Sequence, residues 1–351
     1  MKIVVDMNHP GHVHFFKNFI WEMKKRGHKV LITAGQKDVA FKLLKNYDLD
    51  FVSLGGYGDT IIKKTLNIPV LTWRMYQAVK DFKPDLFVGI GSFRSAHISF
   101  LLGKKCLIFD DSEPALITQL MYLPFATKVL TPTCFRKKLG PKQVKYNGYH
   151  EIAYLHPDYF KSEKSIWKDL DLKPKSAYFV MRFVSWKAGH DIGRKGLTEQ
   201  EKIKLVKLLS RYGKVLISSE AELPKKLEPY RFKIPVEKMH NTLYHATLFV
   251  GDSQTMATEA ALLGTPTVRY NSFAGPDDMG NFIELEKDYG LMFSFNDFKQ
   301  AFNKTKELLG MKELKEKWQK KRLKLFSDKI DVTAMMVKMV ENYQKKPKKH
   351  S

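Results

Sequence analysis

Residues 251–266 combine side chains and spacing that could bind a phosphate group. The apolar run 247–251 predicts a buried parallel strand, and a small polar turn follows it. That turn opens an Ala-rich helix, which ends at Gly264. The amino end of such a helix presents free backbone N–H groups and the positive end of the helix dipole, and both favour an anion. Glu259, on the same helix, could accept hydrogen bonds from ribose hydroxyl groups, although an ordinary strand–helix unit with a surface Glu would look the same.

A group of histidines follows the first expected strand, residues 3–6. Pro10 and Gly11 permit a tight turn, which places His12 near the amino end of a helix. Because a helix amino end disfavours the imidazolium form, His12 can stay neutral and accept a proton. His9, His12 and His14 could instead cap the helix or pack at a domain interface. A metal site is a further alternative, but no carboxylate at suitable spacing accompanies them.

Charged residues occupy two further turns that follow expected strands. Asp111 and Glu113 come after the strand 105–110, and both could act as acids or bases. Arg182 and Lys187 belong to the segment around the strand 177–184, where they could neutralise a diphosphate. Since Arg182 falls within that strand, it could equally belong to a structural ion pair. His190 and Asp191 remain open as substrate contacts.

Alternating strands and helices must position these turns. Apolar runs predict strands at 3–6, 29–33, 51–54, 85–90, 105–110, 128–131 and 144–146, and then at 177–184, 214–218, 231–234, 247–251, 265–270 and 291–293. Helical periodicity predicts helices at 15–26, 199–211, 239–245, 256–263 and 298–309, and throughout 312–343. This alternation is typical of parallel sheets covered by helices on both faces. Ligands of such sheets bind beyond the carboxyl ends of the strands.

Composition limits the classes of protein that this chain can belong to. With 351 residues, 44% of them hydrophobic, the chain can form two domains. No apolar run could cross a bilayer and no signal peptide is evident, so we expect a cytoplasmic protein, with the inner membrane face as an alternative. Cys106 and Cys134 suggest a reducing compartment. The formal charge of +23 favours anionic partners such as nucleotide phosphates or acidic lipid surfaces, whereas no nucleic-acid-binding signature is present.

With these residues in view, the chain resembles a GT-B-fold protein. The similarity is to an uncharacterised domain family related to MurG-type glycosyltransferases and to UDP-N-acetylglucosamine 2-epimerases. It extends over nearly the whole chain and is strongest at residues 251–266. The resemblance implies that Ser253, Gln254 and Thr255 meet a diphosphate, that Glu259 holds the ribose, and that backbone around Pro235 meets the uracil. Gly11-His12-Val13 and the turn 89–93 resemble Gly-rich segments of MurG-type proteins.

The implied fold is α/β and GT-B-like, with two Rossmann-like doubly wound parallel-sheet domains facing a central cleft and a C-terminal helix. We expect an N-terminal acceptor-side domain at 1–158, a linker at 159–174, a nucleotide-sugar-binding domain at 175–325, and a C-terminal helix with a basic tail at 326–351.

The implied function is a glycosyltransferase that moves a sugar, an N-acetylhexosamine, from a UDP-sugar to a hydroxyl acceptor. His12, Asp111 or Glu113 would take the acceptor's proton, while Arg182, Lys187 and the amides at Ser253 to Thr255 would stabilise the departing diphosphate. The UDP-sugar is a substrate, and no separate cofactor is expected. The acceptor is unknown, and a lipid-linked one would fit the segment 63–75, in which Lys and Arg alternate with apolar and aromatic residues.

Two rival functions follow from the same residues. A 2-epimerase would use Glu113, but the absence of an acid near Gly91 argues against it, because one acid cannot readily supply both chemical steps. The other rival is a non-catalytic basic protein that docks on membrane or nucleic acid. No metal is expected, since Asp48-Leu49-Asp50 and Asp169-Leu170-Asp171 match an Asp-x-Asp pattern but lie away from the expected strand ends.

Overall fold

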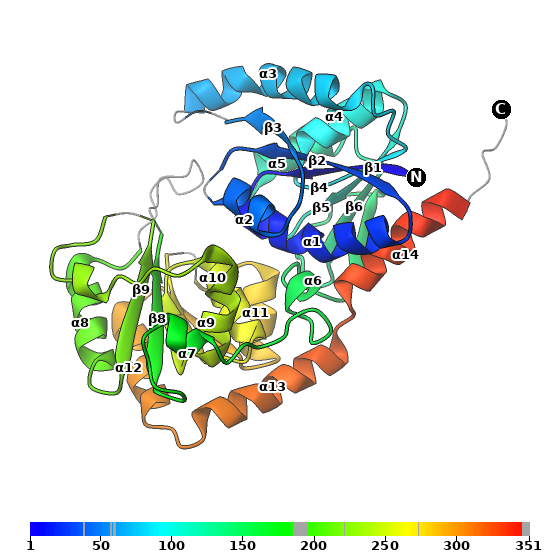
Figure 1. The fold of residues 1–351 in the computed structure, drawn as a ribbon. Coiled ribbons are helices and arrows are strands. Elements are labelled where there is room, and N and C mark those ends of the chain that lie inside the picture. Colours follow the sequence, from blue (N-terminus) through cyan, green and yellow to red (C-terminus); the bar gives the residue numbers. More distant parts are fainter. Residues whose placement is uncertain are drawn as a thin grey trace. The chain divides into compact units, whose positions relative to one another are not determined.

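The structure is a computed structural model that describes residues 1–37, 39–56, 58, 61–184, 196–220, 222–272 and 274–345. The chain divides into two compact units. Unit 1 comprises Met1–Tyr159 and Ile330–Ser351, and unit 2 comprises Phe160–Lys329. Each unit is built around one parallel sheet with helices on its faces (Figure 1).

The sheet of unit 1 has seven parallel strands in the order β3-β2-β1-β4-β5-β6-β7. Its central strands are buried on both faces, which explains why they read as continuous apolar runs. All seven correspond to expected strands; their bounds are β1 (Lys2–Met7), β2 (Lys29–Gly35), β3 (Val52–Gly55), β4 (Leu86–Ile90), β5 (Lys105–Phe109), β6 (Lys128–Pro132) and β7 (Gln143–Tyr146).

Helices cover both faces of this sheet (Figure 1). One face carries α3 (Ile61–Val79), α4 (Phe93–Leu101) and α5 (Leu116–Tyr122), and the other carries α1 (Pro10–Lys25), α2 (Ala40–Asn46), α6 (Ile152–Leu155) and α14 (Val332–Lys345). Helix α1 packs through a buried stripe at helical spacing, formed by Val13, Phe16, Ile20 and Met23.

The sheet of unit 2 has five parallel strands in the order β12-β11-β10-β8-β9. Their bounds are β8 (Tyr178–Phe183), β9 (Lys214–Ser219), β10 (Leu248–Gly251), β11 (Thr267–Tyr270) and β12 (Met292–Phe295). The helices are α7 (Ile166–Asp169), α8 (Glu199–Leu209), α9 (Met239–His245), α10 (Gln254–Leu262), α11 (Gly280–Lys287), α12 (Phe298–Leu309) and α13 (Leu314–Asp328).

The prediction of a strand at 231–234 is wrong. The structure has a single isolated bridge there, between Ile217 and Arg231, beside the edge strand β9. Pro229 lies in a short 3₁₀ turn immediately before it, and Pro235 follows it. Since proline donates no backbone hydrogen bond, too little chain remains between the two prolines to form a ladder.

The end of the chain also differs from the expectation of a continuous helix over 312–343. Helix α13 ends at Asp328 and α14 begins at Val332. The break arises because Asp331 caps α14 by accepting a hydrogen bond from Ala334 N (2.9 Å), and Ile330 N donates to Asn147 O (2.9 Å). Helix α14 therefore belongs to unit 1, where Thr333 Oγ1 donates to Ala153 O (2.8 Å).

The segment 159–174, expected as a linker, packs mostly with unit 2. It contains α7, whose Ile166 is buried. Glu163 N donates to Asn241 Oδ1 (2.7 Å), and Asp169 forms an ion pair with Lys238 (2.6 Å). These contacts give the segment a fixed place beside α9.

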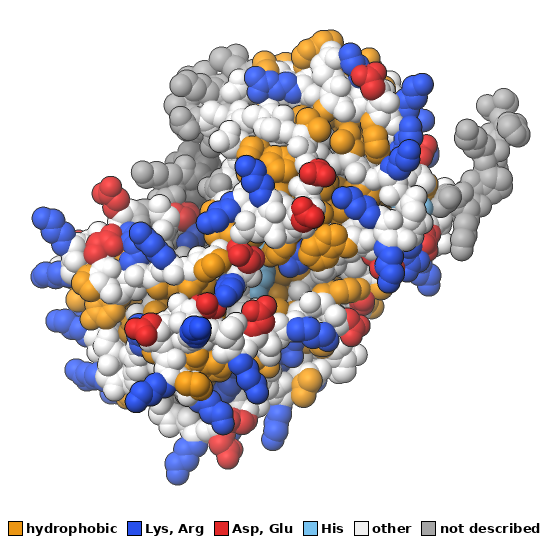
Figure 2. Space-filling view, in the orientation of Figure 1, with side chains coloured by type: hydrophobic (Ala, Val, Ile, Leu, Met, Phe, Trp, Pro, Cys, Tyr) orange, Lys and Arg blue, Asp and Glu red, His pale blue; other side chains and the backbone are white. Residues whose placement is uncertain are grey.

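Surface charge is widely distributed. Figure 2 shows Lys and Arg side chains spread over the visible surface, with acidic and apolar side chains between them. Within the described residues, no helix is long and apolar enough to cross a membrane.

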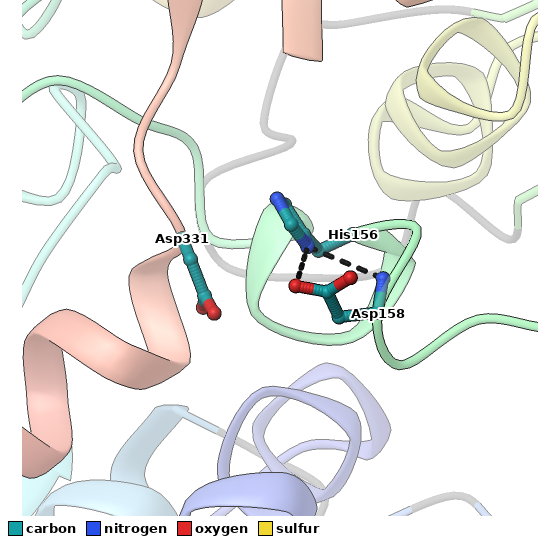
Figure 3. Close-up of side chains that lie close together, drawn as sticks. All are labelled: His156, Asp158 and Asp331. Carbon is teal, nitrogen blue, oxygen red and sulfur yellow. Dashed lines mark hydrogen bonds and ion pairs between the residues drawn. The ribbon is translucent and has the colours of Figure 1, made fainter. Parts of the chain in front are cut away.

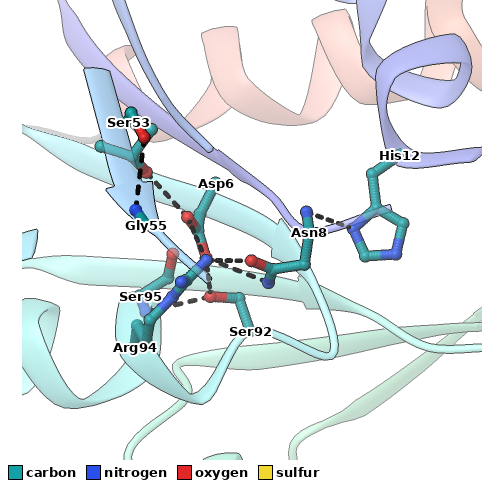
Figure 4. Close-up of polar contacts among 9 residues, drawn as sticks. Asp6, Asn8, His12, Ser53, Gly55, Ser92, Arg94 and Ser95 are labelled. Atoms are coloured by element: carbon teal, nitrogen blue, oxygen red, sulfur yellow. Dashed lines mark hydrogen bonds and ion pairs between the residues drawn. The ribbon is translucent and has the colours of Figure 1, made fainter. Parts of the chain in front are cut away.

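A buried ion pair joins β1 to β4 at the point where the strand order of unit 1 reverses (Figure 4). Arg94 Nη2 donates to Asp6 Oδ1 (2.8 Å), and both side chains are fully buried. Ser92 Oγ donates to Asp6 Oδ2 (2.6 Å) and Thr33 Oγ1 to Asp6 Oδ1 (2.8 Å). Asp6 belongs to β1, whereas Ser92 and Arg94 follow β4, so the network holds the ends of the two strands together.

We predict that Asp6→Ala lowers the free energy of unfolding by about 3–5 kcal/mol, because it leaves a buried guanidinium without its carboxylate. Urea unfolding followed by circular dichroism measures the effect. The exposed Asp81 provides the control, and Asp81→Ala should change stability by less than about 0.5 kcal/mol. Equal stabilities for the two variants would contradict the importance of the network.

Candidate functional site

The amino end of α10 lies at the carboxyl edge of the unit 2 sheet, directly after β10. Ser253 is the N-cap, and its side chain accepts a hydrogen bond from Met256 N (3.4 Å). Gln254 and Thr255 form the first turn and are half-buried, and that turn contains no acidic residue. The positive end of the helix dipole is therefore not compensated within its own first turn, which favours an anion there, although the buried Asp252 lies directly before the N-cap.

The strands β8 and β10 are neighbours at which the strand order of unit 2 reverses. Asp252, buried directly after β10, accepts a hydrogen bond from Val184 N (2.8 Å), which lies directly after β8. A Cβ atom at Gly251 would lie 2.4 Å from Arg182 O, so only glycine permits this approach of the two strands. The sequence thus builds a close junction where doubly wound sheets bind ligands.

Glu259 is buried and contacts a residue that the sequence did not indicate. His240 Nε2 lies 3.1 Å from Glu259 Oε1, and each residue is at least nine-tenths buried. His240 comes from α9 and Glu259 from the middle of α10, so the contact joins the two helices. The sequence suggested Glu259 as a ribose ligand. In the structure, His240 already holds this carboxylate in one orientation.

Arg182 belongs to an ion pair in this structure. Its Nη2 lies 2.6 Å from Glu220 Oε1, and its Nη1 donates to Ser218 Oγ (2.7 Å). Both partners come from β9 or the residue that follows it, and the Arg182 side chain is 21% exposed. The structural alternative for Arg182 is thus observed.

The remaining predicted residues of unit 2 have different outcomes. Pro235 precedes the 3₁₀ turn Val236–Lys238, and its carbonyl accepts a hydrogen bond from Lys238 N (3.0 Å). Lys187, His190 and Asp191 lie outside the described residues.

In unit 1, the segment that resembled a Gly-rich turn is the start of α1, which begins earlier than expected, at Pro10. His9 is the N-cap, and its Nδ1 accepts a hydrogen bond from Gly11 N (3.1 Å). His14 is buried and packs against Tyr47 and Tyr154. His9 therefore caps the helix, and His14 packs against neighbouring rings, as two of the alternatives for these histidines proposed. His12 has different contacts.

His12 lies in the first turn of α1, where its Nδ1 accepts a hydrogen bond from Asn8 N (3.2 Å; Figure 4). Burial lowers the pKa of His12 well below its ordinary value, and the nearby His9 and His150 lower it further, whereas Asp111 raises it. His12 is consequently neutral at pH 7, and the cause is its burial and the neighbouring charges rather than the helix dipole from which the sequence predicted it.

Asp111 forms an ion pair with His150, which the sequence analysis did not identify. Asp111 Oδ2 lies 2.9 Å from His150 Nδ1, and the side chains are 23% and 8% exposed. Burial alone would raise the pKa of Asp111, but His150 outweighs it and the net pKa lies below its usual value. Burial alone would lower the pKa of His150, but Asp111 raises it above its usual value. The two groups therefore hold each other in their charged forms.

The other acids of this turn are fixed by hydrogen bonds. Glu113 is half-buried and its Oε1 accepts from Arg136 N (3.2 Å). Burial raises the pKa of Asp110 to about 6, against the opposing hydrogen bond from Tyr122. Gln119 Nε2 donates to Asp110 Oδ2 (3.1 Å) and to Ser112 O (3.0 Å), so α5 holds the whole turn.

A sequence signal existed for His150 but not for His240. His150 follows β7, a strand that the sequence predicted, and the rule of inspecting residues after strands applies equally there. His240 lies within a helix, at a position that gives no indication of its contact with Glu259.

A group of possible metal ligands lies in unit 1, outside the turns considered above (Figure 3). Ligand atoms of His156, Asp158 and Asp331 lie within 4.8 Å of one another. Two of these side chains also have partners within the protein. Asp331 Oδ2 accepts a hydrogen bond from Tyr159 Oη (2.7 Å), and Asp158 Oδ2 lies 3.4 Å from His156 Nδ1. The Asp-x-Asp pairs are turn and helix-end residues: Asp48 follows α2, and Asp169 ends α7.

Comparison with known proteins gives the family and the fold. The model of the family described as "Protein of unknown function (DUF354)" matches residues 1–345. The uncharacterized protein MJ0665 of Methanocaldococcus jannaschii is 23% identical over 328 residues, which cover 88% of this chain and 92% of that protein.

Several solved structures share the fold. They include UDP-GlcNAc 2-epimerase from Neisseria meningitidis bound to UDP-GlcNAc (11% identity, TM-score 0.67, 99% of this chain and 100% of that chain). S. aureus MnaA with UDP is similar (12%, 0.68, 100% of both chains), as is the spinosyn rhamnosyltransferase SpnG with thymidine diphosphate (14%, 0.61, 97% of this chain and 100% of that chain). The predicted GT-B-like fold with two Rossmann-like domains is confirmed.

We predict that NMR titration of the imidazole groups separates His150 from His12. His150 should titrate above about 6.5, the usual histidine value, and His12 below it. Asp111→Asn should lower the pKa of both, because it removes a negative charge that raises each of them. An unchanged pKa for His150 in that variant would contradict the ion pair.

The same pair predicts how stability depends on pH. Because folding raises the pKa of His150, its contribution is complete below about pH 6.5 and is lost as pH rises through the folded-state pKa. Because folding lowers the pKa of Asp111, its contribution is complete above about pH 4 and is lost as pH falls through the folded-state pKa. Unfolding measured across pH, with Asp111→Asn for comparison, should show the difference between the proteins to be largest between these limits.

Proposed function

The chain belongs to this DUF354 family, and we propose that it is a glycosyltransferase that moves a sugar, an N-acetylhexosamine, from a UDP-sugar donor to a hydroxyl acceptor. The observation that carries the proposal is the amino end of α10, whose first turn contains no acidic residue, at the strand reversal of unit 2. Proteins with the same fold bind UDP, UDP-GlcNAc or thymidine diphosphate, which supports a nucleoside diphosphate as the ligand.

In this proposal unit 2 binds the donor. The first turn of α10, with Ser253, Gln254 and Thr255, receives the diphosphate through backbone N–H groups. Glu259 accepts hydrogen bonds from the ribose, and backbone at Pro235 contacts the uracil. Arg182, whose side chain is 21% exposed, and Lys187 offset the charge of the departing diphosphate.

Unit 1 supplies the group that activates the acceptor. His12 is the preferred proton acceptor, because its pKa keeps it neutral at pH 7. Asp111 is already paired with His150, and its charge favours an imidazolium that forms at His12. Glu113 is the third candidate. The helix dipole and the basic groups of unit 2 supply the electrostatic stabilisation that a metal ion provides in other transferases, so we propose a metal-independent reaction.

A UDP-N-acetylglucosamine 2-epimerase is the second candidate, favoured by the TM-score of 0.67 to each of two structures, the N. meningitidis epimerase and the "putative UDP-N-acetylglucosamine 2-epimerase" from Listeria monocytogenes. The turn after β4 argues against it. There Ser92 and Arg94 bond to the buried Asp6, and no acid occupies residues 89–97.

We predict that Glu259→Gln weakens the binding of UDP by about 10–100-fold, the effect of losing a hydrogen bond to a charged group. Isothermal titration calorimetry measures the affinity. Because Glu259 also contacts His240, the melting temperature of each variant must be measured alongside. Glu316→Gln, an exposed change on α13, is the matched control and should bind UDP as the unaltered protein does. Undiminished binding by Glu259→Gln would count heavily against the proposed donor site.

An NMR time course with UDP-GlcNAc distinguishes the two reactions. A transferase should consume the donor appreciably only when a hydroxyl acceptor is present, whereas an epimerase should convert or hydrolyse it alone. His12→Gln should lower the rate of transfer about 100-fold or more, as expected for loss of a general base. Conversion of the donor alone that requires Glu113 would favour the epimerase.

A further inference from the structure

Large apolar side chains are exposed on one face of unit 1. Exposed fractions are 65% for Phe100 and 68% for Leu101 at the end of α4, and 55%, 77% and 63% for Leu116, Ile117 and Leu120 on α5. Monomeric soluble proteins rarely expose adjacent apolar side chains of this size, and such groups mark binding surfaces. We call these five residues the α4–α5 patch.

The two helices of the patch lie side by side. His97 Nε2 of α4 lies 2.9 Å from Met121 O of α5. The rings of Phe100 and Phe125 pack with their centroids 5.3 Å apart, and Phe125 directly follows the end of α5. On α5, Leu116, Ile117 and Leu120 occur at helical spacing opposite the buried Gln119 and Tyr122. The exposed apolar side chains therefore lie on two helices that pack against each other.

The charged residues within α3, α4 and α5 are all basic. Helices α3, α4 and α5 contain no Asp or Glu, and between residues 86 and 150 the only acids are Asp110, Asp111 and Glu113. Lys104 and Lys105 are exposed directly after α4. Lys142 Nζ donates to Leu123 O (2.9 Å) and Pro124 O (2.7 Å) at the end of α5. An apolar surface with a basic border is complementary to an anionic lipid bilayer.

We propose that the α4–α5 patch docks unit 1 on the surface of an anionic membrane. Aliphatic side chains of α5 enter the boundary between headgroups and acyl chains, while the lysines contact lipid phosphates. Trp73, which is 60% exposed on the neighbouring α3, is the type of side chain that prefers this boundary. A second copy of the chain is a poorer occupant, since its own basic border would face the basic border of the first.

Docking would place the acidic turn of unit 1 near the membrane. The buried face of the same helix α5 holds Asp110 through Gln119 and Tyr122, and Asp111 and Glu113 lie in that turn. If the proposed transferase function also holds, its acceptor would be a hydroxyl group on a lipid-linked molecule. The docking itself does not depend on that function.

Co-sedimentation of the full chain with vesicles tests the proposal. We expect binding to vesicles of phosphatidylglycerol mixed with phosphatidylcholine, weaker binding to phosphatidylcholine alone, and a decrease with added salt. The double variant Ile117→Ser with Leu120→Ser should lose about tenfold or more in vesicle affinity, because two exposed aliphatic side chains no longer insert. Lys104→Glu should weaken binding to the anionic vesicles and leave binding to the neutral ones unchanged.

Leu323→Ser is the matched control, since Leu323 is similarly exposed (62%) but lies on α13 of unit 2. It should bind vesicles as the unaltered protein does. The proposal is overturned if the unaltered protein stays in the supernatant, if Leu323→Ser loses as much affinity as the double variant, or if sedimentation velocity shows the patch substitutions dissociating a dimer instead. UDP affinity of the double variant, measured separately, should be unchanged, so failure of docking and failure of the donor site are distinguishable.

Discussion

The reversal of strand order within each parallel sheet is the constraint on which the arrangement of this protein depends. At a reversal, the chain leaves two neighbouring strands toward opposite faces, so the turns after those strands lie beside each other without a covering helix. In unit 1 the reversal lies between β1 and β4, and in unit 2 between β8 and β10. The first turn of α1, with His12, follows one of these strands, and the first turn of α10 follows another. His12 and the first turn of α10 therefore lie where the sheet of each unit is open.

Both units secure this junction with a buried aspartate. Asp6 in β1 accepts hydrogen bonds from Ser92 and Arg94 after β4, and Asp252 after β10 accepts one from the amide of Val184 after β8. A buried carboxylate is costly unless it is fully hydrogen-bonded, so each aspartate favours one relative position of its two strand ends. In unit 2, the lack of a side chain at Gly251 lets the strands approach as closely as this bond requires. Because these strand ends are fixed, the backbone N–H groups at the start of the following helix point in a fixed direction.

The acidic turn of unit 1 connects three features of the molecule. Asp111 pairs with His150, and this pair influences the charge state of His12. The same turn is held by the inner face of α5, whose outer face is apolar and exposed. One short helix thus contacts a candidate catalytic turn on one side and the surroundings of the protein on the other. Helices α3, α4 and α5 contain no Asp or Glu, and Lys104, Lys105 and Lys142 lie near the ends of α4 and α5.

Local pattern determined the element types, because apolar runs and helical stripes depend only on neighbours in the chain. It predicted every strand of the two sheets, the buried stripe of α1 and the position of α10 after β10, but also a strand at 231–234 that does not form. Tertiary structure decided the partners of the charged side chains, since these lie far apart in sequence: 88 residues separate Asp6 from Arg94, 38 separate Arg182 from Glu220, and 19 separate His240 from Glu259. It also decided that α14 returns to unit 1, because the cap at Asp331 and the contact of Thr333 with Ala153 end a helical pattern that local periodicity would continue. Strand order brings such residues together, and strand order is a property of the whole sheet that no short segment of sequence contains.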